Sequence, residues 1–464
     1  MTSVNDEDGF GGIGRADGIW LGMILAGAVV LGLHGIMQYG YIGQDFLLHL
    51  HLIESYPASY TYELTNPPLI YWLGALIRNH VTATYFLETL GLLFLTLNSV
   101  ALWGFYRLIW EAIASRALRF AAAALITFVP FRVIHSLVIS SDAFTLPVFA
   151  AAACCTLSLL RNPRRVAGWI TLSAVLSLGM AMKYSLVALL PAIAFALAPA
   201  LWRFRANGGI LRYALLGIAA LALPASIFLW EMHETDKLKG PSTYGHWKVP
   251  GTPSIMRWED ILLLKPSDRR LLSAPEYFRD KLYENRVYSY PGLLHVTAFT
   301  DSQNFLQTVT AGIPTGLTHR YQDDPGRTRT PSSQKLQVWS VRWTLPLSLL
   351  VLVGTLASVT VAVPALLSGR WTISPGAAVL TALGFAAYAV IFFSLTSLGD
   401  PYTPGYWLPR LALPGLLSFL CLGFVFCDGV LSRLARWPRL QALLPRLALA
   451  YVVVACALFI GFLG

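Results

Sequence analysis

Charged side chains are scarce in this sequence. Only 12% of its 464 residues are Asp, Glu, Lys or Arg, whereas 56% are apolar, and the mean hydropathy is +0.59. A soluble protein carries about twice that fraction of charged residues. Several apolar runs also reach the roughly 18 to 25 residues that a helix needs to cross a bilayer. The composition therefore excludes an ordinary soluble domain and predicts an all-α polytopic membrane protein.

Cysteines and several common motifs are also missing from the places where they would indicate a function. The five cysteines all lie in apolar runs and the long polar segment contains none, so no disulfide framework is predicted. The sequence has no P-loop, no dinucleotide-binding fingerprint and no zinc-finger spacing. The net charge of +10 does not indicate nucleic-acid binding, because the basic residues cluster in short loops between apolar runs. We expect no cofactor, no metal ion and no nucleic-acid partner.

Eleven apolar runs predict transmembrane helices. They cover residues 18–39, 84–107, 118–134, 143–160, 166–182, 185–201, 212–230, 343–367, 374–397, 408–430 and 446–463. If the N-terminus is cytoplasmic, the cytoplasmic loops contain fourteen arginines and the short external segments contain five basic residues. This positive-inside bias predicts a multi-pass protein with Asp45, Asp142, Lys183 and Arg410 on the external side. The Ala- and Arg-rich composition is typical of a bacterial cytoplasmic (inner) membrane protein, whose external side is the periplasm.

The predicted organisation is a membrane core interrupted by one polar segment. After a cytoplasmic tail (1–17), the core covers residues 18–230, with a first external loop at 40–83. Residues 231–338 form a small external (periplasmic) domain between the seventh and eighth helices, and residues 339–464 form the C-terminal helices. The segment 231–338 contains half of the acidic residues, and its mix of Pro, Gly, Tyr and both charge signs predicts a folded unit. Within it, YENRVYSYPGLLHVTAF is apolar enough to pack against the membrane face.

A few ionisable residues remain at the predicted external face, where burial is costly and a cavity or a partner is expected. The candidates are Asp45 in the first loop, Asp142 in the second, Lys183 between two spans and Arg410 in the last loop. If residues 44–54 are helical, Asp45 and His49 share a face at i and i+4. His49 and His51 are two positions apart and cannot share that face, so a joint metal site is not expected.

Three of these residues also have a plainer interpretation. Asp45 could cap a helix or pair with Arg78. Asp142 follows two serines and precedes an apolar run, which is a helix-start pattern, so capping alone is as well supported as a catalytic role. Lys183 could simply extend its amine to the lipid surface.

Four stretches of the sequence carry a family resemblance. They are QDF with NPPLIYWLGAL in the first loop, SSDAFTL before the fourth span, LGMAMKYSLVALLP, and YWLPRLALP. In this order they resemble the GT-C class of integral-membrane glycosyltransferases, above all the branch of dolichyl-phosphate-mannose protein mannosyltransferases and bacterial aminoarabinose lipid A transferases. The resemblance covers roughly residues 18–230 and, weakly, 375–420.

The sequence departs from that family in two places. Family members commonly have an Asp-Glu pair in the first loop, whereas Phe46 follows Asp45 here. Glu54 or Glu63 could take the place of the second acid. The segment 231–338 lies between spans rather than at the C-terminus, and it resembles no acceptor-binding domain.

The resemblance implies transfer of a sugar from a polyprenyl-phosphate donor to an acceptor outside the membrane, which would be an envelope glycan, lipid or protein. A one-step displacement would invert the anomeric centre. Asp45 would be the general base, and Lys183 and Arg410 would bind the donor phosphate. Asp142 would orient Lys183 or the sugar hydroxyls as a second catalytic residue. The remaining substrate-binding candidates are His49, Tyr184, Tyr402 and Tyr406.

Two other functions fit a membrane protein of this composition. A flippase for a lipid-linked sugar would be expected to show inverted repeats and broken helices near the midplane, but no repeat is visible and the charges gather at one face. A structural scaffold or polymer ligase would bind through residues 231–338. The substitution Asp45→Asn distinguishes these functions, because an enzyme should lose turnover while still binding its lipid.

Overall fold

The computed structural model describes most of the membrane-embedded helices and parts of the polar segment. The described residues are 13–39, 46–58, 67–82, 85–138, 141–203, 210–239, 263–273, 288–300, 308–309, 327–328, 331–368, 374–397, 404–434 and 436–463.

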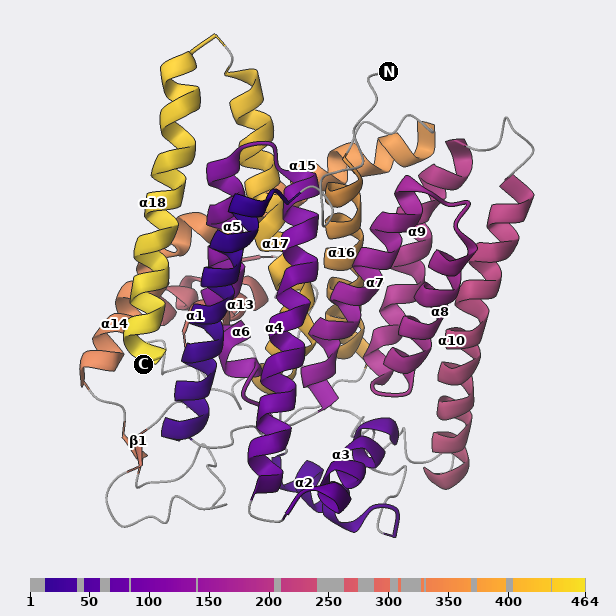
Figure 1. Cartoon of the computed structure of the whole chain (residues 1–464). Coiled ribbons are helices and arrows are strands. Elements are labelled where there is room, and N and C mark those ends of the chain that lie inside the picture. The colour runs from indigo at the N-terminus through magenta and orange to yellow at the C-terminus, as the bar shows by residue number, and fades with distance from the viewer. Residues whose placement is uncertain are drawn as a thin grey trace.

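Each of the eleven predicted apolar runs falls on helical structure (Figure 1). The corresponding helices are α1 (Arg15–Tyr39), α4 (Phe86–Ala112), α5 (Arg116–Phe128), α7 (Thr145–Arg161), α8 (Val166–Met180), α9 (Leu189–Arg203), α10 (Ile210–Lys239), α15 (Leu345–Ser368), α16 (Pro375–Ser397), α17 (Pro404–Arg433) and α18 (Pro438–Leu463). The shorter helices are α2 (Phe46–Ser55), α3 (Leu69–His80), α6 (Pro130–His135), η3 (Ser141–Phe144), η4 (Tyr184–Ala188), η7 (Pro266–Leu272), α13 (Tyr290–Phe299) and α14 (Pro331–Trp343). Two short strands, β1 (Thr308–Val309) and β2 (Arg327–Thr328), pair antiparallel with Thr308 opposite Thr328.

Seven helical stretches among the described residues are long and apolar enough to cross a membrane. They are Arg15–Met37, Phe86–Ala112, Asp142–Arg161, Leu211–Glu231, Ser333–Ala362, Leu413–Arg433 and Pro438–Leu463. Shorter apolar helices cover Val166–Met180, Ser185–Ala198 and Pro375–Ala389. The prediction of an all-helical, multi-pass integral membrane protein is therefore confirmed.

The predicted run 118–134 is not one continuous helix. α5 ends at Phe128 and α6 begins at Pro130, because proline lacks the N–H of the helical ladder and disfavours helical backbone at the preceding residue. Arg132 on α6 is fully buried, and its guanidinium donates a hydrogen bond to the Thr127 carbonyl in the last turn of α5. A cation at the free carbonyls of a helix C-terminus stabilises that end, so Arg132 serves as a cap.

Two hydrophobic clusters hold the helices together. The larger one contains residues of α1, α4, α5, α7, α8, α9, α16, α17 and α18. The smaller one lies at one end of the bundle, where α2 and α3 pack against α4 and η3 (Figure 1). Glycine allows the closest approach between α15 and α17: a Cβ added to Gly354 would lie 2.6 Å from the Leu422 carbonyl oxygen.

Pairs of charged residues bracket the apolar length of four helices. The pairs are Asp142 and Arg161 around α7, Arg165 and Lys183 around α8, Arg212 and Glu231 on α10, and Arg410 and Asp428 on α17. The members of each pair are eighteen or nineteen residues apart, or about 28 Å along a helix, which is close to the roughly 30 Å of a hydrocarbon core. We call the end of the bundle with Asp142 and Lys183 the Lys183 end, and the other the Asp428 end.

The polar segment after α10 returns to the bundle through η7, α13 and α14. α10 itself continues to Lys239, beyond the predicted end of the seventh span at residue 230. α13 packs against α6, α14 and α17, and its Val296 and Phe299 are buried. The predicted packing of this stretch against the membrane face stays a prediction, and within it α13 packs against helices of the bundle.

His295 fastens α13 to α14 and α15. Its Nε2 lies 2.9 Å from the Val341 carbonyl oxygen, which can only accept, so Nε2 carries the proton. Nδ1 then accepts a hydrogen bond from the Ser348 hydroxyl at 2.6 Å. Burial lowers the pKa of His295 to about 4, because the charged imidazolium loses its hydration there.

Candidate functional site

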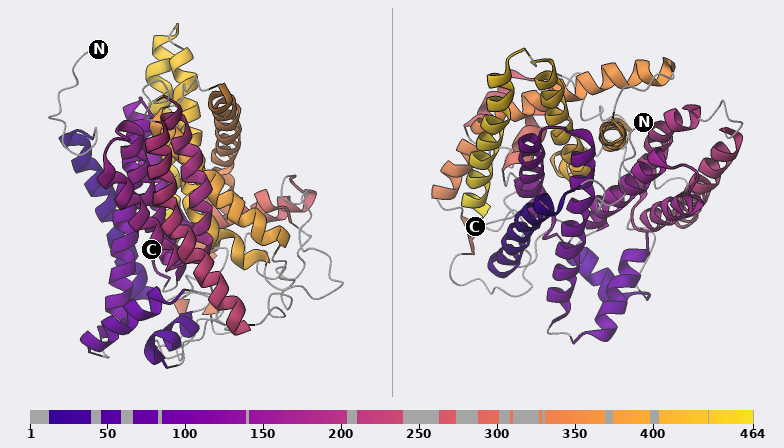
Figure 2. Two further views of the ribbon diagram at one scale, coloured as in Figure 1. Left: turned by 90° about the vertical axis from the view of Figure 1, so that its right-hand side faces the viewer. Right: turned by 45° about the horizontal axis from the view of Figure 1, so that its top comes forward.

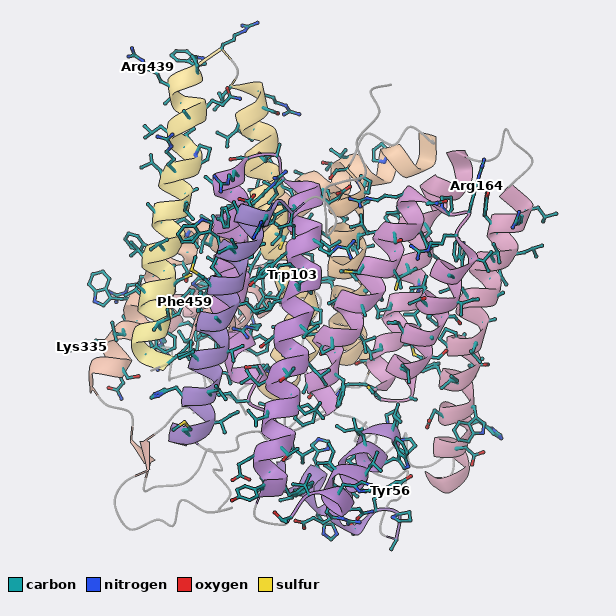
Figure 3. All side chains as sticks on the ribbon, viewed as in Figure 1. Tyr56, Trp103, Arg164, Lys335, Arg439 and Phe459 are labelled. Carbon is teal, nitrogen blue, oxygen red and sulfur yellow. The ribbon has the colours of Figure 1, made fainter. Side chains whose placement is uncertain are left out.

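The first loop folds into two short helices that pack as one unit at the Lys183 end. Gly74 on α3 faces Ile53 on α2 so closely that an added Cβ would lie 2.7 Å from the Ile53 side chain. The Arg78 guanidinium donates to the Ile53 carbonyl oxygen at 3.2 Å. Figure 3 shows Tyr56, just after α2, at the opposite end of the molecule from Arg439. The α2–α3 unit therefore lies at this end of the bundle (Figure 3).

His49 is held between α2 and α3. Its Nδ1 lies 3.1 Å from the Tyr71 hydroxyl oxygen, and the two rings stack with centroids 5.9 Å apart. Both side chains are buried, and Tyr71 is 0% exposed. The orientation of the His49 ring is therefore set from within the α2–α3 unit.

Asp142 lies in η3, immediately before α7. Its carbonyl accepts a hydrogen bond from the Thr145 hydroxyl at 2.7 Å, and the neighbouring Ala143 carbonyl accepts one from the Asn98 amide of α4 at 3.2 Å. The N-cap residue of α7 is Phe144, with no side-chain cap. Asp142 is therefore not the N-cap residue of α7, and it lies in the first turn of η3. Its carboxylate is paired elsewhere.

That partner is Lys183, whose amine forms an ion pair with the Asp142 carboxylate. The Lys183 side chain is 14% exposed and that of Asp142 is 6% exposed. The backbone N–H of Lys183 donates to the Gly179 carbonyl at 2.9 Å and closes the end of α8. The alternative in which Lys183 extends to the lipid surface is therefore wrong, because its amine turns inward to the carboxylate.

The loop that carries Lys183 is also joined to the first loop. The backbone N–H of Leu69, at the start of α3, donates to the Ala181 carbonyl at 3.3 Å. Met182 packs on the smaller hydrophobic cluster, to which α2, α3, α4 and η3 contribute. Five elements, namely α2, α3, α4, η3 and the loop with Met182, thus meet around one small core next to the buried ion pair.

The structure therefore brings His49, Asp142 and Lys183 to the same end of the bundle, on elements that pack around the smaller cluster. Asp45 precedes the first residue of α2 in the sequence but lies outside the described residues, as does Tyr402. The other predicted site residues lie on elements whose backbone is described but whose side chains at these positions are not: Tyr184 on η4, and Tyr406 and Arg410 on α17.

Sequence reasoning missed two residues that support this arrangement, Tyr71 and Asn98. A signal existed for Asn98, because an amide inside the apolar run LTLNSVAL needs hydrogen-bond partners in a membrane. Those partners are the carbonyls of Phe94, at 2.9 Å, and Ala143. No comparable signal marks Tyr71, since an aromatic residue in LIYWLGAL suits a lipid-facing position as well as a buried one.

Within the described ranges, no group of three or more His, Cys, Asp or Glu side chains could hold a metal ion. Asp45 lies outside those ranges, so the expectation that no metal takes part stays a prediction.

No protein-family model and no curated protein matches this chain. Among solved structures, the chain is similar to the crystal structure of the Archaeoglobus fulgidus oligosaccharyltransferase in the apo form, with 14% sequence identity and a TM-score of 0.47. The similarity covers 97% of this chain and 56% of that one, so this chain spans little more than half the length of the archaeal protein. A likeness at this score does not show a function.

Proposed function

We propose that this protein is a GT-C-like membrane glycosyltransferase that moves a sugar from a polyprenyl-phosphate donor to an acceptor outside the membrane. The observation that carries the proposal is the buried Lys183–Asp142 ion pair beside the α2–α3 unit. Burying two charges costs stability compared with apolar side chains of the same size. The pair lies at one end of the apolar length of the bundle, which is the depth at which the phosphate of a lipid carrier sits.

The proposed topology has eleven transmembrane helices and a cytoplasmic N-terminus. The Lys183 end then faces the periplasm of a bacterial inner membrane, and the Asp428 end faces the cytoplasm. The arginine-rich loops of the sequence support this orientation. Residues 40–83 form the catalytic loop, and residues 231–338 form the external domain between the seventh and eighth helices.

Lys183 and Arg410 are proposed to bind the donor phosphate. The Asp142 carboxylate neutralises Lys183, so the amine is held in place at a desolvated position. An arriving phosphate can take over that amine, because its oxygens are also strong acceptors of charge-assisted hydrogen bonds. The Asp142 carboxylate then becomes able to accept hydrogen bonds from the sugar hydroxyls.

The proposed chemistry is a single displacement at the anomeric carbon. The acceptor hydroxyl or amine attacks this carbon as its bond to the phosphate oxygen breaks, and the configuration inverts. Asp45 takes the proton of the acceptor as general base. The electron pair of the broken bond leaves with the polyprenyl phosphate, whose growing negative charge Lys183 and Arg410 stabilise.

Substrate contacts complete the proposal. His49 follows Asp45 by four residues, and its ring is positioned by Tyr71. Tyr184, Tyr402 and Tyr406 would offer aromatic surfaces and hydroxyls to the sugar. The acceptor would be an envelope glycan, a lipid or a protein.

The test is release of the lipid phosphate from a panel of polyprenyl-phosphate sugars by the purified full-length protein. We expect at least one donor to release polyprenyl phosphate when an acceptor is added. Asp45→Asn should lower this rate by roughly 100- to 10,000-fold while donor binding persists. The matched control is Glu88→Gln, which changes an exposed acid in the first turn of α4 and should leave the rate unchanged.

A flippase remains the alternative function, and the same assay separates the two. A flippase moves the whole lipid across the membrane and leaves the bond between sugar and phosphate intact. Release of polyprenyl phosphate at the wild-type rate by Asp45→Asn would instead refute the assigned base.

A further inference from the structure

The hairpin between α17 and α18 projects beyond the rest of the bundle at the Asp428 end (Figures 1 and 2). The Asp428 carboxylate accepts hydrogen bonds from the backbone N–H groups of Ala114 and Ser115, at 2.7 and 2.9 Å, at the start of α5. These contacts align Asp428 with the end of the neighbouring helices. α17 nevertheless continues to Arg433, five residues further.

The second arm of the hairpin has a similar overhang. α18 begins at Pro438, eight residues before Arg446, which corresponds to about 12 Å of helix. The apolar run predicted from the sequence begins at residue 446, so residues 438–445 of α18 precede it. A bilayer of about 40 to 45 Å with a 30 Å hydrocarbon core leaves a headgroup layer of roughly 5 to 8 Å on each side. The overhang therefore extends through that layer.

The charges of the hairpin are of one sign. Arg433, Arg436 and Arg439 are all exposed, and no ion pair joins any of them to a described residue. Asp428 is the last acidic residue of the sequence, and its oxygens already accept the backbone bonds of α5. Figure 3 shows Arg439 at the outermost part of the molecule. The hairpin therefore presents three cations without a compensating acid.

Apolar side chains accompany these cations. Trp437 is 62% exposed at the turn, and Leu440 and Leu443 are exposed on the first turns of α18. The exposed row continues through Leu447 to Val454 along the same helix, so it is continuous with the lipid-facing surface of the protein. Tryptophan beside arginine at the end of an apolar helix is the pattern of a membrane interface.

We propose that the α17–α18 hairpin, through Arg433, Arg436, Arg439 and Trp437, binds the headgroups of anionic phospholipids in the leaflet at the Asp428 end. The arginines match the negative phosphates, while Trp437 and the leucines lie in the adjoining interface. The continuity with the lipid-facing row favours a lipid surface over a soluble partner. This inference does not rest on the sugar-transfer chemistry.

The test measures binding of phosphatidylglycerol to the full-length protein in neutral detergent by native mass spectrometry, with phosphatidylcholine as the comparison lipid. Each basic residue near an anionic surface is worth about a fivefold change in affinity. The triple variant R433Q/R436Q/R439Q should therefore bind phosphatidylglycerol at least about tenfold more weakly, with unchanged affinity for phosphatidylcholine. The wild-type preference should also weaken as salt is added.

The matched control is R164Q/R165Q/R212Q, which removes three exposed arginines of the same end outside the hairpin. It should retain most of the phosphatidylglycerol affinity. Equal losses in both triple variants, or no loss in either, would overturn the proposal. So would a hairpin variant that keeps its lipid affinity but loses binding to a soluble acidic protein, because that result assigns the surface to a protein partner.

A second measurement tests the proposal even if the triple variant does not fold. A photoreactive residue introduced at Trp437 in the otherwise unchanged protein should crosslink to phosphatidylglycerol more than to phosphatidylcholine. Crosslinking to neither lipid would contradict the proposal.

Discussion

The two ends of the bundle use charge in different ways. At the Asp428 end, Arg116 pairs with Asp17 at 2.7 Å while the Arg116 side chain stays 63% exposed. At the Lys183 end, both members of the Lys183–Asp142 pair are largely withdrawn from solvent. An exposed ion pair contributes at most about 1 kcal/mol to stability and has little desolvation cost. A buried ion pair has a large desolvation cost, so it adds little net stability compared with apolar side chains. This contrast supports the proposed role of the Lys183–Asp142 pair in donor binding.

The largest expected difference between the ends is the cost of removing one partner. Lys183→Met or Asp142→Asn leaves a buried charge without its partner and should destabilise the protein by about 3 to 5 kcal/mol. Arg116→Ala should cost less than about 1 kcal/mol. Reversible unfolding in mixed detergent measures all three. A cost below 1 kcal/mol for both single variants at the Lys183 end would remove the contrast.

The double variant Lys183→Met/Asp142→Leu sharpens the same comparison. Because it removes both charges, it should recover most of the stability that either single variant loses. It should not recover donor binding or transfer. Recovery of transfer in this variant would show that the pair has only a structural role.

His295 provides a buried neutral group to compare with the buried ion pair. Its folded pKa of about 4 lies below an unfolded value of about 6.5, so the unfolded chain binds more protons between these values. Stability is then fully present above pH 6.5 and decreases as the pH falls towards 4, by roughly 3 kcal/mol at most. His295→Gln should flatten this pH dependence, while His51→Gln, an exposed residue of α2, should not. An unchanged slope in His295→Gln would contradict the assignment.

The next effect tests how tightly the α2–α3 unit is packed. Gly74→Ala places a methyl group 2.7 Å from Ile53 and should cost about 1 to 3 kcal/mol. Gly22→Ala on α1 meets no atom within 4 Å, so it should be neutral or slightly stabilising, because alanine favours helix. Thermal unfolding of the two variants in one detergent measures the difference. Equal midpoints would show that the α2–α3 unit adjusts freely.

The smallest effect concerns the single hydrogen bond between Tyr71 and His49. Tyr71→Phe keeps the packing but removes the hydroxyl, so it should cost about 1 kcal/mol and lower the transfer rate a few-fold through a less fixed His49. Tyr85→Phe, at an exposed residue of the same end, is the control. A transfer rate equal to that of the wild type would show that the Tyr71 hydroxyl does not position His49 for the reaction.

The positions of the membrane helices were predictable, because apolar length alone decides where a chain can cross a bilayer. The break inside 118–134 was predictable too but was missed, since the apolar run continues through Pro130. The overhang of α17 and α18 was not predictable from hydropathy, which does not distinguish a lipid-facing leucine from one in the headgroup layer. The alternation of spans assigns each charged loop to one side of the membrane. It does not predict how far a helix extends past the hydrocarbon core on that side.

Several residues of the candidate site could be predicted from the sequence, but the contacts between them could not. Asp142 and Lys183 could be assigned to the same face by alternating the helices, but forty residues and two helices separate them. Whether the lysine would turn to the acid or to the lipid depends on packing, which no local pattern reveals. The same holds for His49 and Tyr71, because no local sequence pattern predicts that two rings on different helices will stack.

The most direct test of the account is the affinity of a polyprenyl-phosphate sugar for Lys183→Ala compared with Lys335→Ala, an exposed lysine of α14. A cation that holds the donor phosphate should be worth at least about 1.5 to 3 kcal/mol, or roughly tenfold or more in the dissociation constant. We expect Lys183→Ala to lose that affinity with little change in acceptor binding, while Lys335→Ala matches the wild type. Unchanged donor affinity in a folded Lys183→Ala protein would contradict the account.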